Sequence, residues 1–437
     1  MKIDLIIHNA RLVTCASNGK PKRLSEMRDV GLIENGAVAI DGGNIAAVGK
    51  SENILSEFEA ENAIDAKGKV VCPGFVDPHT HIVFAGDRLN EFELKIKGAD
   101  YLEILASGGG ILSTVQKTRE ASAAELVEHS RKRLDKMLEH GTLTAEIKTG
   151  YGLETETEMK MLTAIFTLDK THPVDIIPTF LPAHAVPFAD FSGRNANLSN
   201  EEIADLYTNL ICEEMLPVVS RDIRQLESDK PFFVDVFCEK NAFNLAQSKR
   251  ILETAKSFGL KLKAHVDEFT NLGGARMAIE LGATSIDHLD TISDEEIALL
   301  AASDTIGIVT PAVNFNFGAT QFADARKMID AGCAIALSTD YNPGSAPCPS
   351  QSMAMAIACR YQKLLPAEAL NAATINAAFA IGCGQKVGSL ETGKQADLLI
   401  LDTNDHREIA HEFGGNLVET VVKKGKIVVS RSNGFKR

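Results

Sequence analysis

The sequence predicts an α/β protein in which a (β/α)8 barrel of the TIM type carries a small β-sandwich domain formed from both termini. Three observations support this prediction. The chain of 437 residues is too long for one ordinary compact core, whereas a barrel with an attached domain accommodates that length. Between residues 69 and 385, short β-rich runs alternate with longer helical patterns, and polar residues gather where the runs end.

The two flanks of the chain differ from its middle. Residues 1–68 and 386–437 both consist of short apolar runs separated by turn residues, as where 37–40 is followed by the turn 41–44. Either flank alone is too small to form a good core. We therefore expect both flanks to join in one β-sandwich domain, with residues 69–385 forming the barrel.

Eight β-rich runs in the middle of the chain are candidates for the barrel strands. They cover residues 70–83, 143–148, 174–180, 232–237, 261–266, 285–288, 305–309 and 334–338. Helical patterns between them cover residues 123–140, 201–219, 245–258 and 294–302. In a barrel of this kind, the residues that follow the strands form the active face.

Composition and charge exclude several classes of function. The formal net charge of −14, without a basic run, argues against nucleic acid or an anionic membrane as a partner. No apolar stretch reaches membrane-spanning length, and the first residues lack the apolar core of a signal peptide. The eight cysteines are scattered without disulfide or metal-binding spacing. We expect a cytoplasmic globular protein.

Two histidines separated by one residue stand at the end of the first predicted barrel strand. Side chains two positions apart on an extended strand point the same way, so His79 and His81 form half of a metal site. The alternative for such a pair is two buried histidines bonded to backbone. Further candidate ligands at other strand ends, His265 and Asp340, favour the metal site.

These four residues form a set of three imidazoles and one carboxylate. Such a set suits one divalent or trivalent metal ion per chain, zinc or iron, and leaves room for water. The metal would lower the pKa of that water towards ~7 and polarise a substrate carbonyl. Taken singly, His265 could be a core histidine and Asp340 a turn residue before the segment 341–345.

Three further residues near the strand ends are candidates for proton transfer or for a second metal. Glu268 is expected on the loop above the barrel mouth, where a carboxylate can exchange a proton with a ring nitrogen; a solvated loop glutamate is the alternative. His288 lies where it can contact both the activated water and Asp340. Lys148 could be a carbamylated bridge in a two-metal site, but nothing requires a second metal, and a structural or substrate-side role is favoured.

The loop after the two histidines carries a candidate for substrate binding. Arginine is the usual choice for planar, bidentate binding of a carboxylate, and Arg88 stands on this loop. Tyr151 and His184 can add hydrogen bonds from neighbouring loops. The alternative for Arg88 is a surface ion pair with Glu91 or Glu93. The sequence thus predicts a small-molecule substrate with at least one carboxylate.

Segments along the whole chain resemble the imidazolonepropionase family, the amidohydrolase-superfamily enzymes of histidine degradation. The matching segments include Asp77-Pro78-His79-Thr80-His81, Gly150-Tyr151-Gly152, Ala183-His184-Ala185-Val186-Pro187 and Asp340-Tyr341-Asn342-Pro343-Gly344-Ser345. The paired histidines with the distal His and Asp mark only the superfamily, whereas the other segments are far more specific.

The resemblance implies a role for each matched residue. The implied metal ligands are His79, His81, His265 and Asp340. The implied substrate contacts are Arg88, Tyr151, His184, Glu268, Asn342, Gly344 and Ser345. The implied catalytic residues are Glu268, His288 and Asp340, with His288 transferring protons. The resemblance also implies a homodimer that opens 4-imidazolone-5-propanoate to N-formimino-L-glutamate through metal-activated water.

Two rival functions and some departures from the family pattern stay open. A deaminase or another cyclic amidohydrolase of the same superfamily shares the His265-x-x-Glu268 spacing, but a nucleobase has no carboxylate for Arg88 to bind. A non-catalytic binding relative would typically lack metal ligands, and none is missing here. Pro182, Val266 and the segment 310–315 depart from the family pattern at the rim of the site.

Overall fold

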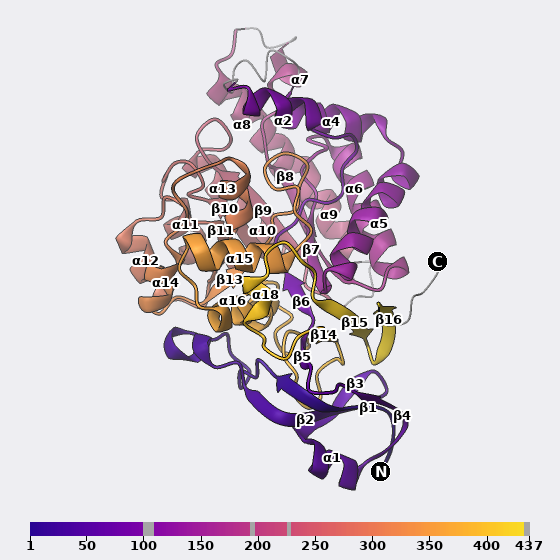
Figure 1. The fold of residues 1–437 in the computed structure, drawn as a ribbon. Helices are drawn as coiled ribbons and strands as arrows, with labels where there is room; N and C mark the ends of the chain where they lie inside the picture. Colours follow the sequence, from indigo (N-terminus) through magenta and orange to yellow (C-terminus); the bar gives the residue numbers. More distant parts are fainter. Residues whose placement is uncertain (99–108, 193–196, 225–228, 432–437) are drawn as a thin grey trace.

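The computed structural model describes residues 1–98, 109–192, 197–224 and 229–431 and confirms the predicted barrel with a β domain built from both termini (Figure 1). Eight parallel strands follow one another around the barrel in chain order. They are β6 (Phe75–Asp77), β7 (Thr142–Lys148), β8 (Asp175–Ala183), β9 (Phe233–Cys238), β10 (Lys261–Val266), β11 (Ser285–His288), β12 (Ile306–Val309) and β13 (Ile335–Leu337).

The barrel closes just beyond the carboxyl ends of its first and last strands. Thr80, after β6, forms a parallel bridge with Tyr341, after β13. The amide of His81 donates to the carbonyl of Tyr341 at 3.0 Å. Asp77 strengthens this junction, because its carboxylate accepts hydrogen bonds from the hydroxyls of Ser338 and Thr339, both at 2.5 Å. The closure therefore brings two distant segments together at the mouth of the barrel.

Strands from both ends of the chain form a second, mixed sheet, seen below the barrel in Figure 1. Its members are β1 (Lys2–Val13), β2 (Leu32–Asp41), β3 (Asn44–Lys50), β4 (Glu59–Asp65), β5 (Val70–Pro73), β14 (Leu398–Leu401), β15 (Val418–Lys423) and β16 (Lys426–Ser430). The two parts of the chain meet where β5 pairs with β1 on one side and with β14 on the other.

The strand expected over residues 70–83 is divided, which corrects the sequence prediction. Its first part, β5, belongs to the terminal sheet, and only β6 enters the barrel. Pro73 has no amide hydrogen to donate, and a side chain on Gly74 would approach Leu143 Cδ1 to 2.3 Å, so the chain changes sheets at this pair. The paired histidines consequently lie after the strand and not on it.

The helices on the outside of the barrel follow the predicted patterns closely. Helix α5 (Ala123–Glu139) begins with a capping box between Ser122 and Glu125 and buries Leu126, Leu134 and Leu138 along one face. The helix expected over 201–219 is instead α8 (Asn200–Leu210), a π turn over Ile211–Met215 and α9 (Leu216–Ile223). Pro217 in the first turn of α9 cannot donate to the carbonyl four residues earlier, which accounts for the interruption.

The remaining helices connect the strands or flank the terminal sheet. They are α1 (Ser51–Glu57), α2 (Leu89–Ile96), α4 (Ile111–Glu120), α6 (Thr155–Thr171), α7 (Phe188–Ser192), α10 (Leu245–Ser257), α11 (Gly274–Leu281), α12 (Asp294–Ala301), α13 (Pro311–Asn316), α14 (Ala325–Asp330), α15 (Gln351–Tyr361), α16 (Pro366–Ala372), α17 (Ile375–Ala380) and α18 (Glu408–His411), with a 3₁₀ turn at Leu24–Arg28. Within the described ranges, no helix is both long and apolar enough to span a membrane.

Buried ion pairs join the barrel to the terminal sheet at the end opposite the site. Lys423 of β15 donates to Asp175, the first residue of β8, at 2.7 Å and to Asp397 at 2.6 Å. Lys424 contacts the other oxygen of Asp175 at 2.9 Å. Burial by itself raises the pKa of Asp175, but these lysines outweigh it and hold that pKa well below its usual range. Asp175 therefore stabilises the folded protein more when it is ionised than when it is protonated.

We predict that Asp175→Asn lowers the free energy of unfolding at pH 7 by roughly 3 kcal/mol, because it removes one of the two carboxylates that pair with the buried Lys423. The pKa of Asp175 is lower in the folded than in the unfolded chain, so this stabilisation is present above pH ~4 and is lost as pH falls towards the folded value. Urea unfolding at a series of pH values measures this. Towards acid pH, the free energy of unfolding should fall less steeply for the variant than for the wild type.

The matched control for Asp175 is Glu128→Gln, which removes an exposed ion pair with Lys132 on α5. This change should leave stability nearly unaltered, because exposed pairs contribute little. Equal stability losses for the two variants would show that the buried contacts of Asp175 do not hold the sheet to the barrel.

Candidate metal centre

Three imidazoles and one carboxylate converge at the mouth of the barrel. Nε2 of His81 lies 3.2 Å from Nε2 of His79 and 3.4 Å from Nε2 of His265. Oδ1 of Asp340 lies 3.4 Å from Nε2 of His79 and 3.6 Å from Nε2 of His81. All four side chains are buried. The structure therefore brings together the four residues that the sequence singles out as metal ligands.

The nitrogen and oxygen atoms of this cluster are arranged as ligands of a metal ion and not as hydrogen-bond partners of one another. The Nδ1 atom of His79 lies 2.7 Å from Asp287 Oδ2, and that of His265 lies 3.0 Å from Asp235 Oδ2. A neutral imidazole has only one N–H, and in these two rings a carboxylate faces Nδ1. The proton of each ring then lies on Nδ1, and the lone pair on Nε2 faces the centre of the cluster. Histidines that bind metals commonly have this arrangement, with a carboxylate accepting the N–H of the other nitrogen.

The electrostatics of the cluster also favour a metal ion. Burial, reinforced by neighbouring cations and imidazoles, lowers the pKa of His79 and of His81 well below the usual range, which keeps both rings in the neutral form that binds metals. Burial raises the pKa of Asp340, although Asn342 donates a hydrogen bond to it. A cation next to a buried carboxylate opposes such a rise, so this environment favours an ion between the imidazoles and Asp340.

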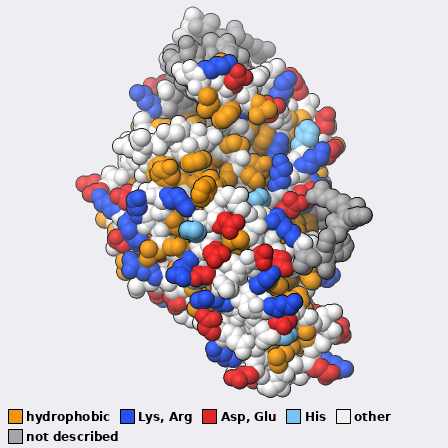
Figure 2. All heavy atoms as spheres, in the orientation of Figure 1, with side chains coloured by type: hydrophobic (Ala, Val, Ile, Leu, Met, Phe, Trp, Pro, Cys, Tyr) orange, Lys and Arg blue, Asp and Glu red, His pale blue; other side chains and the backbone are white. Residues whose placement is uncertain are grey.

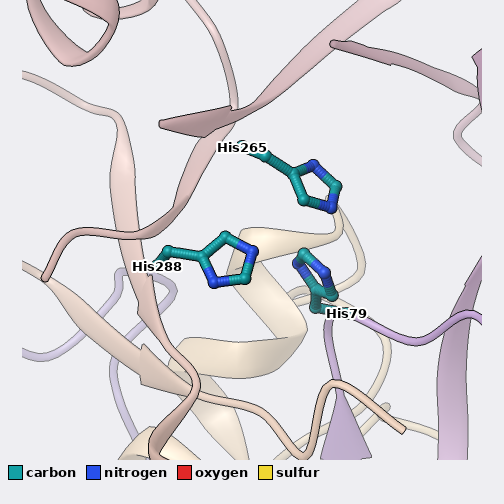
Figure 3. Close-up of side chains that lie close together, drawn as sticks. All are labelled: His79, His265 and His288. Atoms are coloured by element: carbon teal, nitrogen blue, oxygen red, sulfur yellow. The ribbon is translucent and has the colours of Figure 1, made fainter. Parts of the chain in front are cut away.

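His288 and Glu268 stand beside this cluster. Figure 3 shows the ring of His288 facing His79 and His265, and the ring centroids lie 5.3 and 5.2 Å apart. The three rings also place one nitrogen each within 4.8 Å of one another, so His288 is near enough to reach an ion. On its outer side, Nδ1 of His288 contacts the Thr310 hydroxyl at 3.1 Å. His288 has a φ of +82°, an uncommon value for a residue with a side chain and one that often marks a functional site.

Glu268 lies past the end of β10, as expected, and not on the strand. Its side chain is only 11% exposed, and Oε2 is 3.8 Å from Nε2 of His288. Burial, reinforced by the negative charge of Asp340, raises the pKa of Glu268 well above its usual range. The environment of a solvated loop glutamate, the alternative left open by the sequence, is not observed. A carboxyl group next to a neutral imidazole is an arrangement that can pass a proton.

Tyr151 and His184 cover one side of the cluster. The ring of His184 stacks on that of His81 at 4.8 Å, and the Tyr151 ring lies 5.5 Å from His184. Nδ1 of His184 contacts the carbonyl of Gly150 at 3.1 Å. Burial lowers the pKa of His184 to about 3, so this ring is a neutral donor or acceptor at physiological pH.

A buried carboxylate shapes the loop that carries Tyr151. Glu158 on α6 accepts hydrogen bonds from the amides of Gly150, Gly152 and Leu153 at 3.1, 2.7 and 2.9 Å. Gly150 has a φ of +107°, and a Cβ there would come within 2.8 Å of His184 Nδ1. Gly150, the first glycine of the Gly-Tyr-Gly segment, therefore permits a close approach between this loop and His184.

Arg88 makes the ion pair that the sequence leaves open as an alternative. Its Nε atom pairs with Glu91, while Nη1 lies 3.4 Å from the Thr114 hydroxyl. The guanidinium also faces the loop after β13, because a Cβ on Gly344 would come within 3.1 Å of Arg88 Nη1. The side chain is only 12% exposed, so Glu91 holds it in a partly buried position beside the site and not on the open surface.

The loop after β13 is organised by its own asparagine. Asn342 Nδ2 donates to the Asp340 carbonyl at 2.7 Å and to the Ser345 hydroxyl at 2.7 Å. Its Oδ1 accepts from the amides of Gly344 and Ser345 at 2.8 and 2.7 Å. Asn342 thus shapes the turn that presents Gly344 and Ser345, and direct substrate contact by these three residues stays a prediction.

Two aspartates that have no assigned role in the sequence prediction lie behind the cluster, together with Lys148. Asp235 and Asp287 hold the imidazoles of His265 and His79, as described above. Lys148 Nζ donates to Asp235 Oδ2 and to Glu146 Oε1, both at 2.7 Å. Burial by itself lowers the pKa of Lys148, but the carboxylates outweigh it and raise that pKa, so the nitrogen stays protonated. A protonated amine favours the structural role of Lys148 over a carbamylated bridge.

The structure places each of the departures at the rim. The carbonyl of Pro182 in β8 accepts a hydrogen bond from the hydroxyl of Tyr207 at 2.9 Å. Val266 is the last residue of β10, and the segment 310–315 supplies Thr310, which contacts His288, and most of α13. None of these residues displaces a predicted ligand.

A parallel barrel with a His/Asp metal-binding site at the carboxyl ends of its strands defines a metal-dependent amidohydrolase. Two amidohydrolase family models match the chain, at residues 239–428 and at residues 62–101. The chain is also 53% identical to an imidazolonepropionase from Chloroflexus aggregans, covering 98% of this chain and 99% of the relative. An imidazolonepropionase from Herpetosiphon aurantiacus is 50% identical, covering 97% of both chains. The chain belongs to the imidazolonepropionase family.

The fold is similar to that of solved structures of other proteins. An adenosine deaminase from Xanthomonas campestris with bound zinc superposes with a TM-score of 0.68 at 19% identity, covering 98% of this chain and 94% of that protein. At this level of identity, the similarity supports the fold alone.

We predict that Gly150→Ala destabilises the protein by clearly more than 2 kcal/mol, because the new methyl group combines a positive φ with the contact to His184. The matched control is Gly259→Ala, at a φ of +78° with no heavy atom within 4 Å of the added Cβ. This control should cost only about 1–2 kcal/mol. Urea unfolding measures both variants, and equal losses would contradict the close approach of the loop to His184.

Proposed function

We propose that this protein hydrolyses 4-imidazolone-5-propanoate to N-formimino-L-glutamate in L-histidine degradation. The observation that carries the proposal is a complete His/Asp metal centre with an arginine and a tyrosine beside it, in a chain of this family. In this reaction the oxygen of water bonds to the ring carbonyl carbon, the adjacent C–N bond breaks, and the released nitrogen gains a proton.

His79, His81, His265 and Asp340 would hold one ion, zinc or iron, since three imidazoles and a carboxylate accept either. When bound, such an ion lowers the pKa of a coordinated water towards ~7 and polarises a carbonyl. The protein contributes the position of these donors and a buried environment, in which electrostatic interactions are stronger than in water.

Glu268 and His288 are the residues to which we assign proton transfer. They lie 3.8 Å apart at the edge of the metal cluster, so either can exchange a proton with a substrate atom above it. The raised pKa of Glu268 makes its carboxyl able to donate a proton to the nitrogen that leaves the ring. Asp340 would accept a hydrogen bond from the attacking water while it helps to hold the metal.

Arg88 and Tyr151 are the residues to which we assign the propionate of the substrate. The pair with Glu91 orients the guanidinium and leaves donors on its Nη atoms for a ligand carboxylate. His184, Asn342, Gly344 and Ser345 would line the same pocket. A nucleobase deaminase of the same fold would have no use for such an arginine, and a non-catalytic relative would have no need of four intact metal donors.

We also propose a cytoplasmic homodimer. The eight cysteines are all free, and five of them are buried, which suits a reducing compartment. The homodimer rests on the family resemblance, and light scattering of the purified protein would test it.

The proposed function is tested by adding purified protein to imidazolonepropionate and following the loss of its absorbance together with the formation of formiminoglutamate. We expect turnover by the metal-loaded protein, its loss on treatment with a chelator, and little metal or activity in His265→Ala. A panel of purine and pyrimidine amines serves as the control. Release of ammonia from that panel, without ring opening of imidazolonepropionate, would favour a deaminase instead.

We predict that Arg88→Met lowers kcat/KM for imidazolonepropionate by about 10- to 100-fold, because a charge-assisted pair of this kind is worth roughly 1.5–3 kcal/mol. An imidazolone that lacks the propionate should be affected far less. Arg88→Lys should rescue only partly, since it keeps the charge but loses the planar fork. Steady-state kinetics with both substrates measures this. Equal losses for the two would assign Arg88 to loop structure through Glu91 alone.

A further inference from the structure

A group of charged side chains lies wholly inside the barrel, below the metal centre. Its members are Glu146, Lys148, Asp235, Lys263 and Asp287, and none is exposed to solvent. Charged groups are rarely buried unless they are paired, because removing them from water is costly. A group of this size in the barrel interior therefore calls for a function.

The ammonium of Lys148 is the centre of this group. Nζ lies 2.7 Å from Glu146 Oε1, 2.7 Å from Asp235 Oδ2 and 3.5 Å from Asp287 Oδ2. The three carboxylates come from three strands, β7, β9 and β11. One cation thus joins acidic side chains from three strands of the barrel.

The two aspartates use the same oxygen for the lysine and for a histidine. Oδ2 of Asp235 contacts both Lys148 Nζ and Nδ1 of His265, the latter at 3.0 Å. Oδ2 of Asp287 contacts Lys148 Nζ and Nδ1 of His79, the latter at 2.7 Å. Each of these two imidazoles is therefore connected to Lys148 through a single carboxylate oxygen.

The third carboxylate connects Lys148 to the segment between the paired histidines. Oε2 of Glu146 lies 3.4 Å from the amide of Thr80, and the Thr80 hydroxyl donates to the Glu146 carbonyl at 2.6 Å. The amide of Lys148 donates to the carbonyl of Thr80 at 2.9 Å. Lys148 therefore has contacts leading to His79, to His265 and to the backbone that precedes His81.

We propose that Lys148 is a positioning residue for the metal centre, whose ammonium holds Asp235 and Asp287 in the places from which they orient His265 and His79. This inference rests on the proposed function only in taking the His/Asp cluster as the site of a metal. Lys148 does not touch the substrate or the ion; it acts through the two aspartates.

Simple electrostatics explains why a cation is needed at this position. Without Lys148, Asp235 would face His265 with no lysine or arginine from the described part of the chain to pair with it, and Asp287 would keep only Lys263, at 3.6 Å. Buried carboxylates without a compensating charge turn towards other donors. This movement removes the acceptor that directs the Nε2 lone pair of each imidazole to the metal.

The test measures how firmly the protein holds its metal. Zn²⁺-loaded wild type, Lys148→Met and Lys148→Gln are mixed with excess chromogenic chelator, and the rate of zinc transfer is followed by absorbance. Changes next to metal-bound histidines typically weaken metal binding by 10–100-fold. We expect zinc release to be about 10–100-fold faster for Lys148→Met and intermediate for Lys148→Gln, whose amide keeps one donor but no charge.

The matched control is Lys423→Met, which removes another buried lysine paired with two aspartates, at the opposite end of the barrel. It should lower thermal stability without changing the rate of zinc release. If Lys148→Met or Lys148→Gln is folded and releases zinc at the wild-type rate, or if Lys423→Met speeds release equally, the proposal is wrong. Because zinc retention is measured without substrate, a wild type that binds zinc firmly but does not open imidazolonepropionate would instead overturn the proposed function.

Discussion

The site depends on the closure of the barrel between its first and last strands. Two short strands, β6 and β13, end before the barrel is complete, and the segments that follow them meet through Thr80 and Tyr341. Asp77 binds the backbone and hydroxyl of Thr339 across this junction. The residues next to these contacts are His79, His81 and Asp340. The same contacts that close the barrel therefore set the distances among three of the four candidate metal donors.

The interior of the barrel has been adapted to hold charge below that junction. A barrel of this type is usually filled by layers of branched apolar side chains. Here Lys148 and Lys263 are among the largest fully buried side chains, and three carboxylates surround Lys148. Replacing such a cluster by apolar residues is often neutral or stabilising in other proteins, so stability alone does not account for it. The geometry of the cluster accounts for it better, since two of its three acidic members contact the Nδ1 atoms of two imidazoles.

Much of the fold and the chemical elements of the site could be predicted from the sequence, because they depend on local pattern. The strands β10 and β11 begin and end where the apolar runs do, and the polar residues that follow the runs do converge. The break between β5 and β6 cannot be predicted locally, because an uninterrupted apolar run does not reveal a change of sheet. The role of Asp235 cannot be predicted locally either, because this residue alternates with Val234 and Val236, a pattern that also fits a strand with one face in water. Nothing local indicates that this face points into a barrel. For Arg88, the sequence offered a ligand contact and a pair with Glu91, and only the path of the chain into α2 shows that the ion pair forms.

The terminal sheet has a consequence for how the protein is made. Strand β5 lies between β1, from the start of the chain, and β14, which leaves the ribosome only after every strand of the barrel. Until then one edge of β5 lacks its partner, and an unpaired edge is a template for wrong association. Pairings between distant parts of a chain also form slowly. A nascent chain of this protein therefore carries an open β edge through almost all of its synthesis, and β14 is the segment that removes it.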